Sequence, residues 1–91
     1  MKLLPLPHKL HVNPPFPVEI AVSADGETLT VAIEWPIVAG WLGAHAPDDA
    51  SVRHVLHERR HEIERVLEAH LFAQGTPLSG EVTLTADDFR A

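Results

Sequence analysis

The sequence predicts a small α+β domain, in which a three- to four-stranded antiparallel sheet is covered on one face by one short and one long helix. Two observations predict this class. Apolar and polar residues alternate on both sides of an Asp25-Gly26 turn, which is the pattern of a half-buried hairpin. After Asp48 the apolar residues recur every three to four positions instead, as they do in a helix with one buried face. The expected order is strand, strand, short helix, long helix, strand.

The hairpin is the clearest element. Its strands share one apolar face, formed by Val18, Ile20, Val22, Leu29, Val31 and Ile33. Trp35-Pro36 then ends the second strand, and Pro36 suits the first turn of a helix. This short, strongly apolar helix runs to Gly43, and its two glycines make it dependent on packing.

The long helix is expected to begin at a cap formed by Asp48 or Asp49 and to run to about Ala73, before Gly75. Residues 81–85 then alternate as a last strand, followed by a polar tail over residues 86–91. The predicted core contains Ile20, Val22, Leu29, Val31, Ile33, Val52, Leu56, Ile63, Val66, Leu67 and Leu84.

The chain divides into an N-terminal arm, residues 1–17, and a single α+β domain, residues 18–91. The arm is rich in proline, which favours extended backbone. Within it Leu10 and Val12 alternate with Lys9 and His11, which allows a short edge strand, and Phe16 is expected to pack on the core.

Composition excludes several classes of protein. The formal charge is −6, with 13 acidic against 7 basic residues, so we expect no nucleic-acid partner. There is no cysteine, which excludes a disulfide framework and a thiol nucleophile. No stretch approaches the roughly 18 apolar residues of a membrane span. We therefore expect a soluble, cytoplasmic protein that needs no cofactor and contacts no membrane.

One string in the long helix has the form of a catalytic motif. His57-Glu58-Arg59-Arg60-His61 spells the HExxH signature, in which two histidines bind zinc and the glutamate acts as general base. At roughly 100° per residue, however, His57 and His61 lie far from the apolar stripe and face solvent. We therefore interpret this string as part of a helix face that contacts solvent. The alternative is a minimal zinc hydrolase with Glu58 as its catalytic residue.

His54 lies on the same outward stripe as His57 and His61. Such a stripe can bind a metal at the protein surface or titrate near neutral pH, so a histidine metal-binding protein is a further alternative. His70 lies on the buried face instead. We expect His70 to be a hydrogen-bonded histidine of the core or helix end.

Four residues are candidates for an interface: Trp35, Trp41, Arg59 and Arg60. Arg59 falls inside the apolar stripe and Arg60 at its edge, where a charge is costly unless it is paired or reaches an interface. Tryptophan side chains are frequent anchors of binding energy. We expect a non-catalytic module that binds an unidentified protein or itself, in the second case as a homodimer.

The hairpin, the short helix and the middle of the long helix together resemble a small bacterial family catalogued as domain of unknown function 1488. In that family a strand leads to an Asp-Gly turn, a second strand ends in an Ile-Ser pair that opens a short helix ending in Gly, and a long helix carries a His-Arg pair followed by Ile-Glu. The matching residues are Asp25, Gly26, Ile33, Gly43, Arg60, Ile63 and Glu64. The resemblance implies a compact α+β fold with no established activity, cofactor or catalytic residue.

Overall fold

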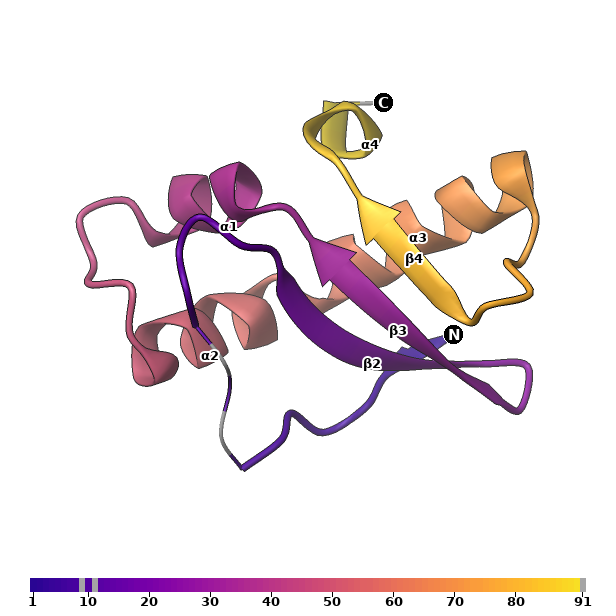
Figure 1. The fold of residues 1–91 in the computed structure, drawn as a ribbon, viewed down its shortest axis with the longest axis horizontal. Helices are drawn as coiled ribbons and strands as arrows, with labels where there is room; N and C mark the ends of the chain where they lie inside the picture. Colours follow the sequence, from indigo (N-terminus) through magenta and orange to yellow (C-terminus); the bar gives the residue numbers. More distant parts are fainter. Residues whose placement is uncertain (9, 11, 91) are drawn as a thin grey trace.

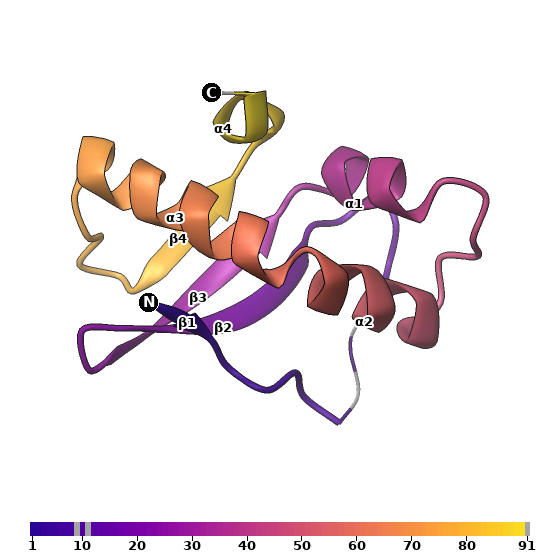
Figure 2. The ribbon, with the colours of Figure 1, turned by 180° about the vertical axis from the view of Figure 1, so that it is seen from behind.

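The fold is a single sheet with helices on one face. The computed structural model describes residues 1–8, 10 and 12–90, and within them one sheet has the strand order β1-β2-β3-β4. Its strands are β1 (Lys2–Leu3), β2 (Val18–Ala24), β3 (Glu27–Ile33) and β4 (Glu81–Leu84). The helices are α1 (Trp35–Leu42), α2 (Asp49–Glu58), α3 (Arg60–Gln74) and α4 (Ala86–Arg90). Helices α2 and α3 cross one face (Figures 1 and 2), which confirms the α+β class.

The hairpin forms as predicted. Strands β2 and β3 pair antiparallel, with Val22 opposite Leu29, and the turn residues Asp25 and Gly26 have φ angles of 51° and 83°. Positive φ at both central residues is what the tightest hairpin turns require. The apolar face of the hairpin is buried under the helices. The opposite face, which carries Glu19, remains open.

The last strand runs in the other direction from the one predicted. Strand β4 pairs with β3 in parallel, with Val31 opposite Val82, so the sheet is mixed rather than antiparallel. The reason is the length of the connection. Helices α1, α2 and α3 carry the chain back across the sheet, so that β4 begins at the same end as β3 (Figure 1).

The predicted long helix is two helices. Asp48 caps α2 by accepting a hydrogen bond from the Ser51 backbone at 2.8 Å, and Gly75 ends α3, as expected. Between them Arg59 leaves helical geometry, and the chain changes direction (Figure 2). At this break the Arg60 guanidinium donates to the His57 carbonyl at 2.8 Å. A side chain thus satisfies a carbonyl at the helix end, without a proline or glycine to mark the break in the sequence.

The N-terminal arm differs from the prediction in two places. Its edge strand is Lys2–Leu3, whereas Leu10 and Val12 are outside any strand and the predicted strand residues Lys9 and His11 lie outside the described part. Leu10 fills the core instead, at 7% exposure. Phe16 is 62% exposed and does not pack on the core. It closes a turn in which its backbone N–H bonds to Asn13.

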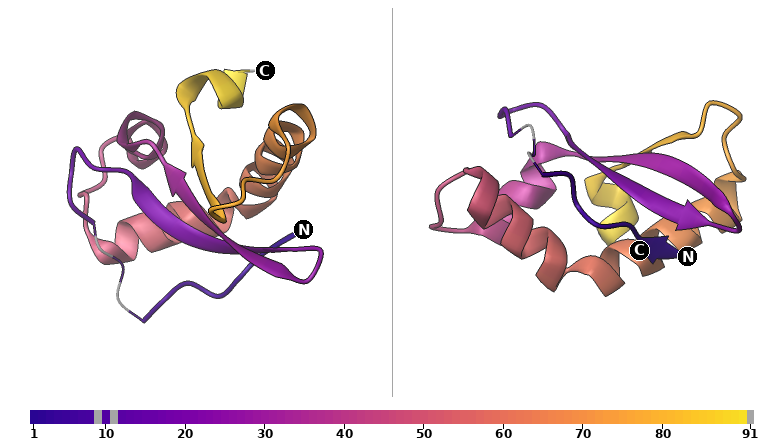
Figure 3. Two further views of the ribbon diagram at one scale, coloured as in Figure 1. Left: turned by 45° about the vertical axis from the view of Figure 1, so that its right-hand side comes forward. Right: turned by 90° about the horizontal axis from the view of Figure 1, so that it is seen from below.

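The predicted polar tail is largely helical. Residues 86–90 form α4, while Ala91 lies outside the described residues. The Thr85 backbone N–H donates to Asp88 Oδ2 at 2.8 Å, which is half of a capping box. Figure 3 shows α4 above the end of β4, standing between α1 and α3.

The core matches the predicted list with one exception. Val66 is only partly buried and packs against the outside of the core. The core also takes in six further apolar residues, namely Leu10, Val18, Val38, Leu42, Val55 and Val82.

Candidate functional site

The HExxH string lies at the break between α2 and α3. His57, Glu58 and His61 are all exposed, as the helical periodicity predicted. His57 belongs to the last turn of α2, whereas His61 belongs to the first turn of α3. The two histidines therefore lie on helices with different directions, and not on one continuous helical face.

The polar members of this string have other partners. Glu58 lies 3.9 Å from His54, one turn earlier on α2, and His61 Nδ1 lies 3.3 Å from Glu64 Oε1. The described residues contain no group of three or more His, Cys, Asp or Glu side chains placed to hold a metal ion. No third donor accompanies His57 and His61 there, which a catalytic zinc site needs. The arrangement is that of local contacts between histidine and glutamate side chains along each helix.

Two of the four candidate interface residues, Trp41 and Arg59, meet at the break. The Arg59 guanidinium lies over the Trp41 ring, 5.7 Å from its centroid, and the Phe89 ring meets Trp41 edge-on at 5.4 Å. The first distance is within the roughly 6 Å range of a cation–π contact, and the second geometry is a favoured aromatic pairing. We call Trp41, Arg59 and Phe89 the Trp41–Arg59 face. Three elements of the fold contribute to it.

A shallow depression of about 550 Å³ opens beside this face, lined by Trp41, His45, His54, Val55, Glu58 and Arg59. The Arg59 guanidinium also lies 3.6 Å from the Glu62 carboxylate, and the Arg59 side chain is 48% exposed. The stem therefore packs while the guanidinium remains within reach of solvent. The depression combines an aromatic wall with charges of both signs.

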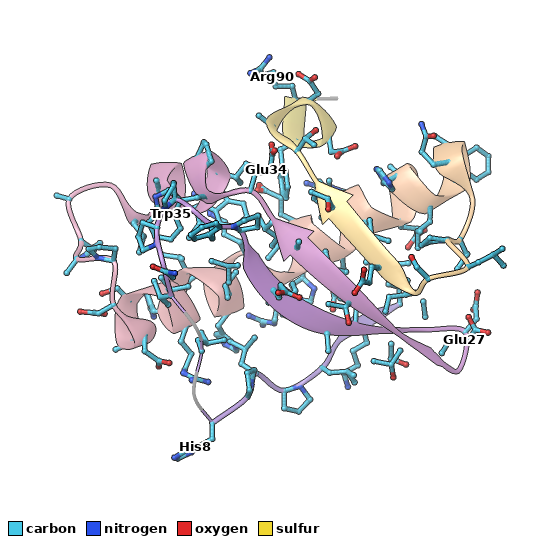
Figure 4. All side chains as sticks on the ribbon, in the orientation of Figure 1. His8, Glu27, Glu34, Trp35 and Arg90 are labelled. Atoms are coloured by element: carbon cyan, nitrogen blue, oxygen red, sulfur yellow. The ribbon has the colours of Figure 1, made fainter. Side chains whose placement is uncertain are left out.

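Trp35 and Arg60 do not join this depression. Trp35 opens α1 directly after Glu34, at the end of β3 (Figure 4), where it is partly buried against the core. Arg60 points to the opposite side of the break and lines a separate depression with residues 2–6 of the arm. Of the four predicted interface residues, the structure brings together only Trp41 and Arg59.

Phe89 is the member of the Trp41–Arg59 face that was not predicted from the sequence. It lies in the segment predicted to be a polar tail, although Thr85-Ala86-Asp87-Asp88 has the spacing of a capping box, which marks the start of a helix. That signal would have placed Phe89 on the first turns of a helix. Its contact with Trp41 depends on the tertiary fold and leaves no pattern in the sequence.

His70 is hydrogen-bonded, as expected, and its partner is on α4. Its Nδ1 lies 3.0 Å from Asp88 Oδ1, and both side chains are 23% exposed. Burial by itself raises the pKa of Asp88, but hydrogen bonds from the Thr85 backbone and from His70 outweigh it and hold this pKa below its ordinary value. This pair fastens α4 to α3 beside the Trp41–Arg59 face.

Two carboxylates at the start of α2 have structural roles. The Leu10 backbone N–H donates to Asp49 Oδ2 at 2.7 Å and lowers the pKa of Asp49, with Arg53 adding to the effect. The hydrogen bond from the Ser51 backbone likewise lowers the pKa of Asp48. Both groups are therefore explained by capping and by docking of the arm, and neither has the raised pKa of a general acid.

Comparison of the chain with protein-family models, curated proteins and solved structures found no match. Among the described residues, no helix is both long enough and apolar enough to cross a membrane.

Proposed function

We propose that this chain is a non-catalytic binding module that recognises another protein through the Trp41–Arg59 face. The observation that supports the proposal most is the guanidinium of Arg59 stacked on Trp41 while half exposed. Tryptophan and arginine are enriched among the residues that dominate binding energy at protein interfaces. A guanidinium held over an aromatic ring is already partly ordered, so the Arg59 side chain loses less entropy when a partner binds there.

The surroundings of Trp41 suit a protein partner better than a small molecule. The depression beside it is shallow, and its lining mixes Val55 with His45, His54 and Glu58. An aromatic centre with a polar rim is the usual composition of a protein interface. Ligand pockets, by contrast, enclose most of their ligand.

The resemblance to the family of unknown function 1488, a bacterial origin and a cytoplasmic location belong to the same proposal. They are supported by the residues quoted for that resemblance and by the composition. Under this proposal the HExxH string contributes local histidine–glutamate contacts, and no residue of the chain performs catalysis.

The proposal can be tested by affinity capture from a lysate of the source cells. The immobilised wild-type chain is compared with Arg59→Ala and with Arg65→Ala, a matched control that removes the same charge from an exposed position of α3. We expect a partner protein that binds the wild type and the control, and that binds Arg59→Ala about thirtyfold more weakly or worse, as for a hot-spot residue.

Urea unfolding of each variant shows whether a loss of binding reflects loss of the fold. Equal capture by all three chains, or capture that Arg65→Ala weakens as much as Arg59→Ala, would remove the Trp41–Arg59 face from the proposal. Stoichiometric zinc together with a hydrolytic activity that Glu58→Gln abolishes would replace the proposal with an enzyme.

A further inference from the structure

The free edge of β4 carries unused backbone hydrogen-bonding groups. The Gly80 carbonyl accepts from Thr30 at 2.8 Å and the Leu84 carbonyl accepts from Glu34 at 3.2 Å, so the even-numbered residues here direct their backbone groups to β3. Glu81 and Thr83 must then direct theirs away from β3. Among the described residues β4 pairs with β3 alone. The Thr83 N–H and the carbonyls of both residues have no strand beside them.

This edge has only some of the features that usually prevent strands from pairing between molecules. Strand β4 is short, with four residues, and carries one charge, on Glu81, but it contains no proline. The segment leading into it carries Leu78, a large apolar side chain at 107% exposure. An open strand edge next to an exposed apolar side chain favours association.

We propose that a second copy of this chain binds here, with the two β4 strands antiparallel about a twofold axis at Val82. This register places Glu81 opposite Thr83 of the second copy and uses the backbone groups of both residues in hydrogen-bonded pairs. The Glu81 N–H exchanges its long, exposed bond to the Ser79 hydroxyl, at 3.3 Å, for the Thr83 carbonyl of the second copy. The two sheets then join into one. Each Glu81 faces a threonine hydroxyl and not another carboxylate.

The two neighbouring registers are less favourable. An axis at Glu81 places the two Glu81 carboxylates directly opposite each other, and like charges in that position are destabilising. An axis at Thr83 pairs Glu81 with Thr85, whose backbone N–H already donates to Asp88 at 2.8 Å. The register centred on Val82 therefore follows from the residues of β4 themselves.

The dimer has a characteristic dependence on salt. Each chain carries a formal charge of −6, so two copies repel each other, and added salt screens that repulsion. Backbone pairing and apolar contacts at β4 are little affected by screening. Association through β4 should therefore strengthen with ionic strength.

Cysteine pairing tests the register directly, since the chain has no cysteine of its own. The Glu81→Cys chain is mixed with the Thr83→Cys chain under mild oxidation. We expect a disulfide-linked heterodimer, because directly opposite residues lie about 5.5 Å apart between Cα atoms, which a disulfide can span. Each variant alone should link far less. Glu19→Cys mixed with Thr83→Cys is the control, because Glu19 is equally exposed but lies on β2.

Light scattering provides the second measurement. The mass should rise from 10.0 kDa toward twice that value as protein or salt concentration increases. Thr83→Pro should prevent this rise, because proline removes an N–H that only the second copy uses. A mass fixed at 10.0 kDa, or cross-linking in the mixture no greater than in the control, would overturn the proposal. None of Trp41, Arg59 and Phe89 lies on β4, and the Thr83 N–H faces away from β3, so Thr83→Pro should leave capture of a partner through Arg59 unchanged while α4 stays docked.

Discussion

The two edges of the sheet are completed in different ways. Along β2 the N-terminal arm pairs as β1 and is fastened to both long helices, with the Leu3 N–H bonded to Glu64 at 2.6 Å and the Leu10 N–H bonded to Asp49 at 2.7 Å. At the other edge only the segment after β4 is fastened, through Asp88 and His70. One edge is therefore covered over much of its length. The other is secured at its end and bare along the strand.

The difference shows two ways in which a terminal segment is held. Besides burying Leu10, the arm docks through its backbone amides, which donate to carboxylates on α2 and α3. These hydrogen bonds do not depend on which side chains the arm carries. Helix α4 docks through the side chains of Asp88 and Phe89. His8, at the outer bend of the arm, and Arg90, in the last turn of α4, both point away from the body (Figure 4).

The largest expected effect concerns whether the arm belongs to the core. Leu10 is 7% exposed, close to the fully buried state of Ile63 near the start of α3. Truncation of either residue to alanine should lower the free energy of unfolding by about 2 to 5 kcal/mol, as typical for a buried aliphatic side chain. Urea denaturation measures both values. Leu78→Ala is the control, because a fully exposed leucine should change stability by less than about 0.5 kcal/mol.

If Leu10→Ala lowers the free energy of unfolding by less than about 1 kcal/mol while Ile63→Ala lowers it by about 2 to 5 kcal/mol, the arm does not belong to the core. The arm would then be an optional cover over a core that is complete without it. If Ile63→Ala itself costs so little, the assignment of the buried face of α3 is wrong.

An intermediate effect is expected where the arm is fastened to α3. Glu64→Ala removes the acceptor of the Leu3 N–H and leaves this partly buried donor unpaired, which should cost about 1 to 2 kcal/mol. Glu64→Gln keeps an acceptor oxygen and should cost less. Glu68→Ala removes the same charge from an exposed position of α3 and serves as control. Hydrogen exchange at Leu3 and Leu4 should accelerate in Glu64→Ala alone; unchanged exchange would show that Glu64 does not hold the arm.

Much of the fold could be predicted from the sequence because its elements have strong local patterns. The alternation around Asp25-Gly26 predicts both strands of the hairpin, and Asp48 and Gly75 mark the ends of the helical region. The direction of β4 could not be predicted in this way. An alternating strand has the same pattern whether it pairs parallel or antiparallel, and only the path of the preceding helices decides.

The candidate site was predictable only in part. Helical periodicity correctly predicted that His57 and His61 are exposed to solvent. It also identified Arg59 as a charged residue within an apolar stripe. The break at Arg59 explains that charge, since the helix turns there and lets Arg59 reach Trp41 instead of the core. Nothing local in the sequence marks this break, and the arrival of Phe89 beside Trp41 depends on the path of β4. Both are tertiary effects.

The smallest expected effect concerns the fastening of α4 and its dependence on pH. The pKa of Asp88 is lower in the folded chain than its ordinary value, so ionised Asp88 contributes stability above about pH 4, and this contribution is lost as pH falls through the folded pKa. Asp88→Asn cannot ionise, and it should cost about 1 kcal/mol at neutral pH, since Asn still accepts a hydrogen bond from Thr85. The difference between wild type and variant should shrink below about pH 4, whereas Asp87→Asn, at an exposed position of α4, should change little at any pH. Urea titrations from acid to neutral pH measure the difference in unfolding free energy between wild type and Asp88→Asn. If this difference stays constant down to pH values well below about 4, the carboxylate of Asp88 does not fasten α4 to His70.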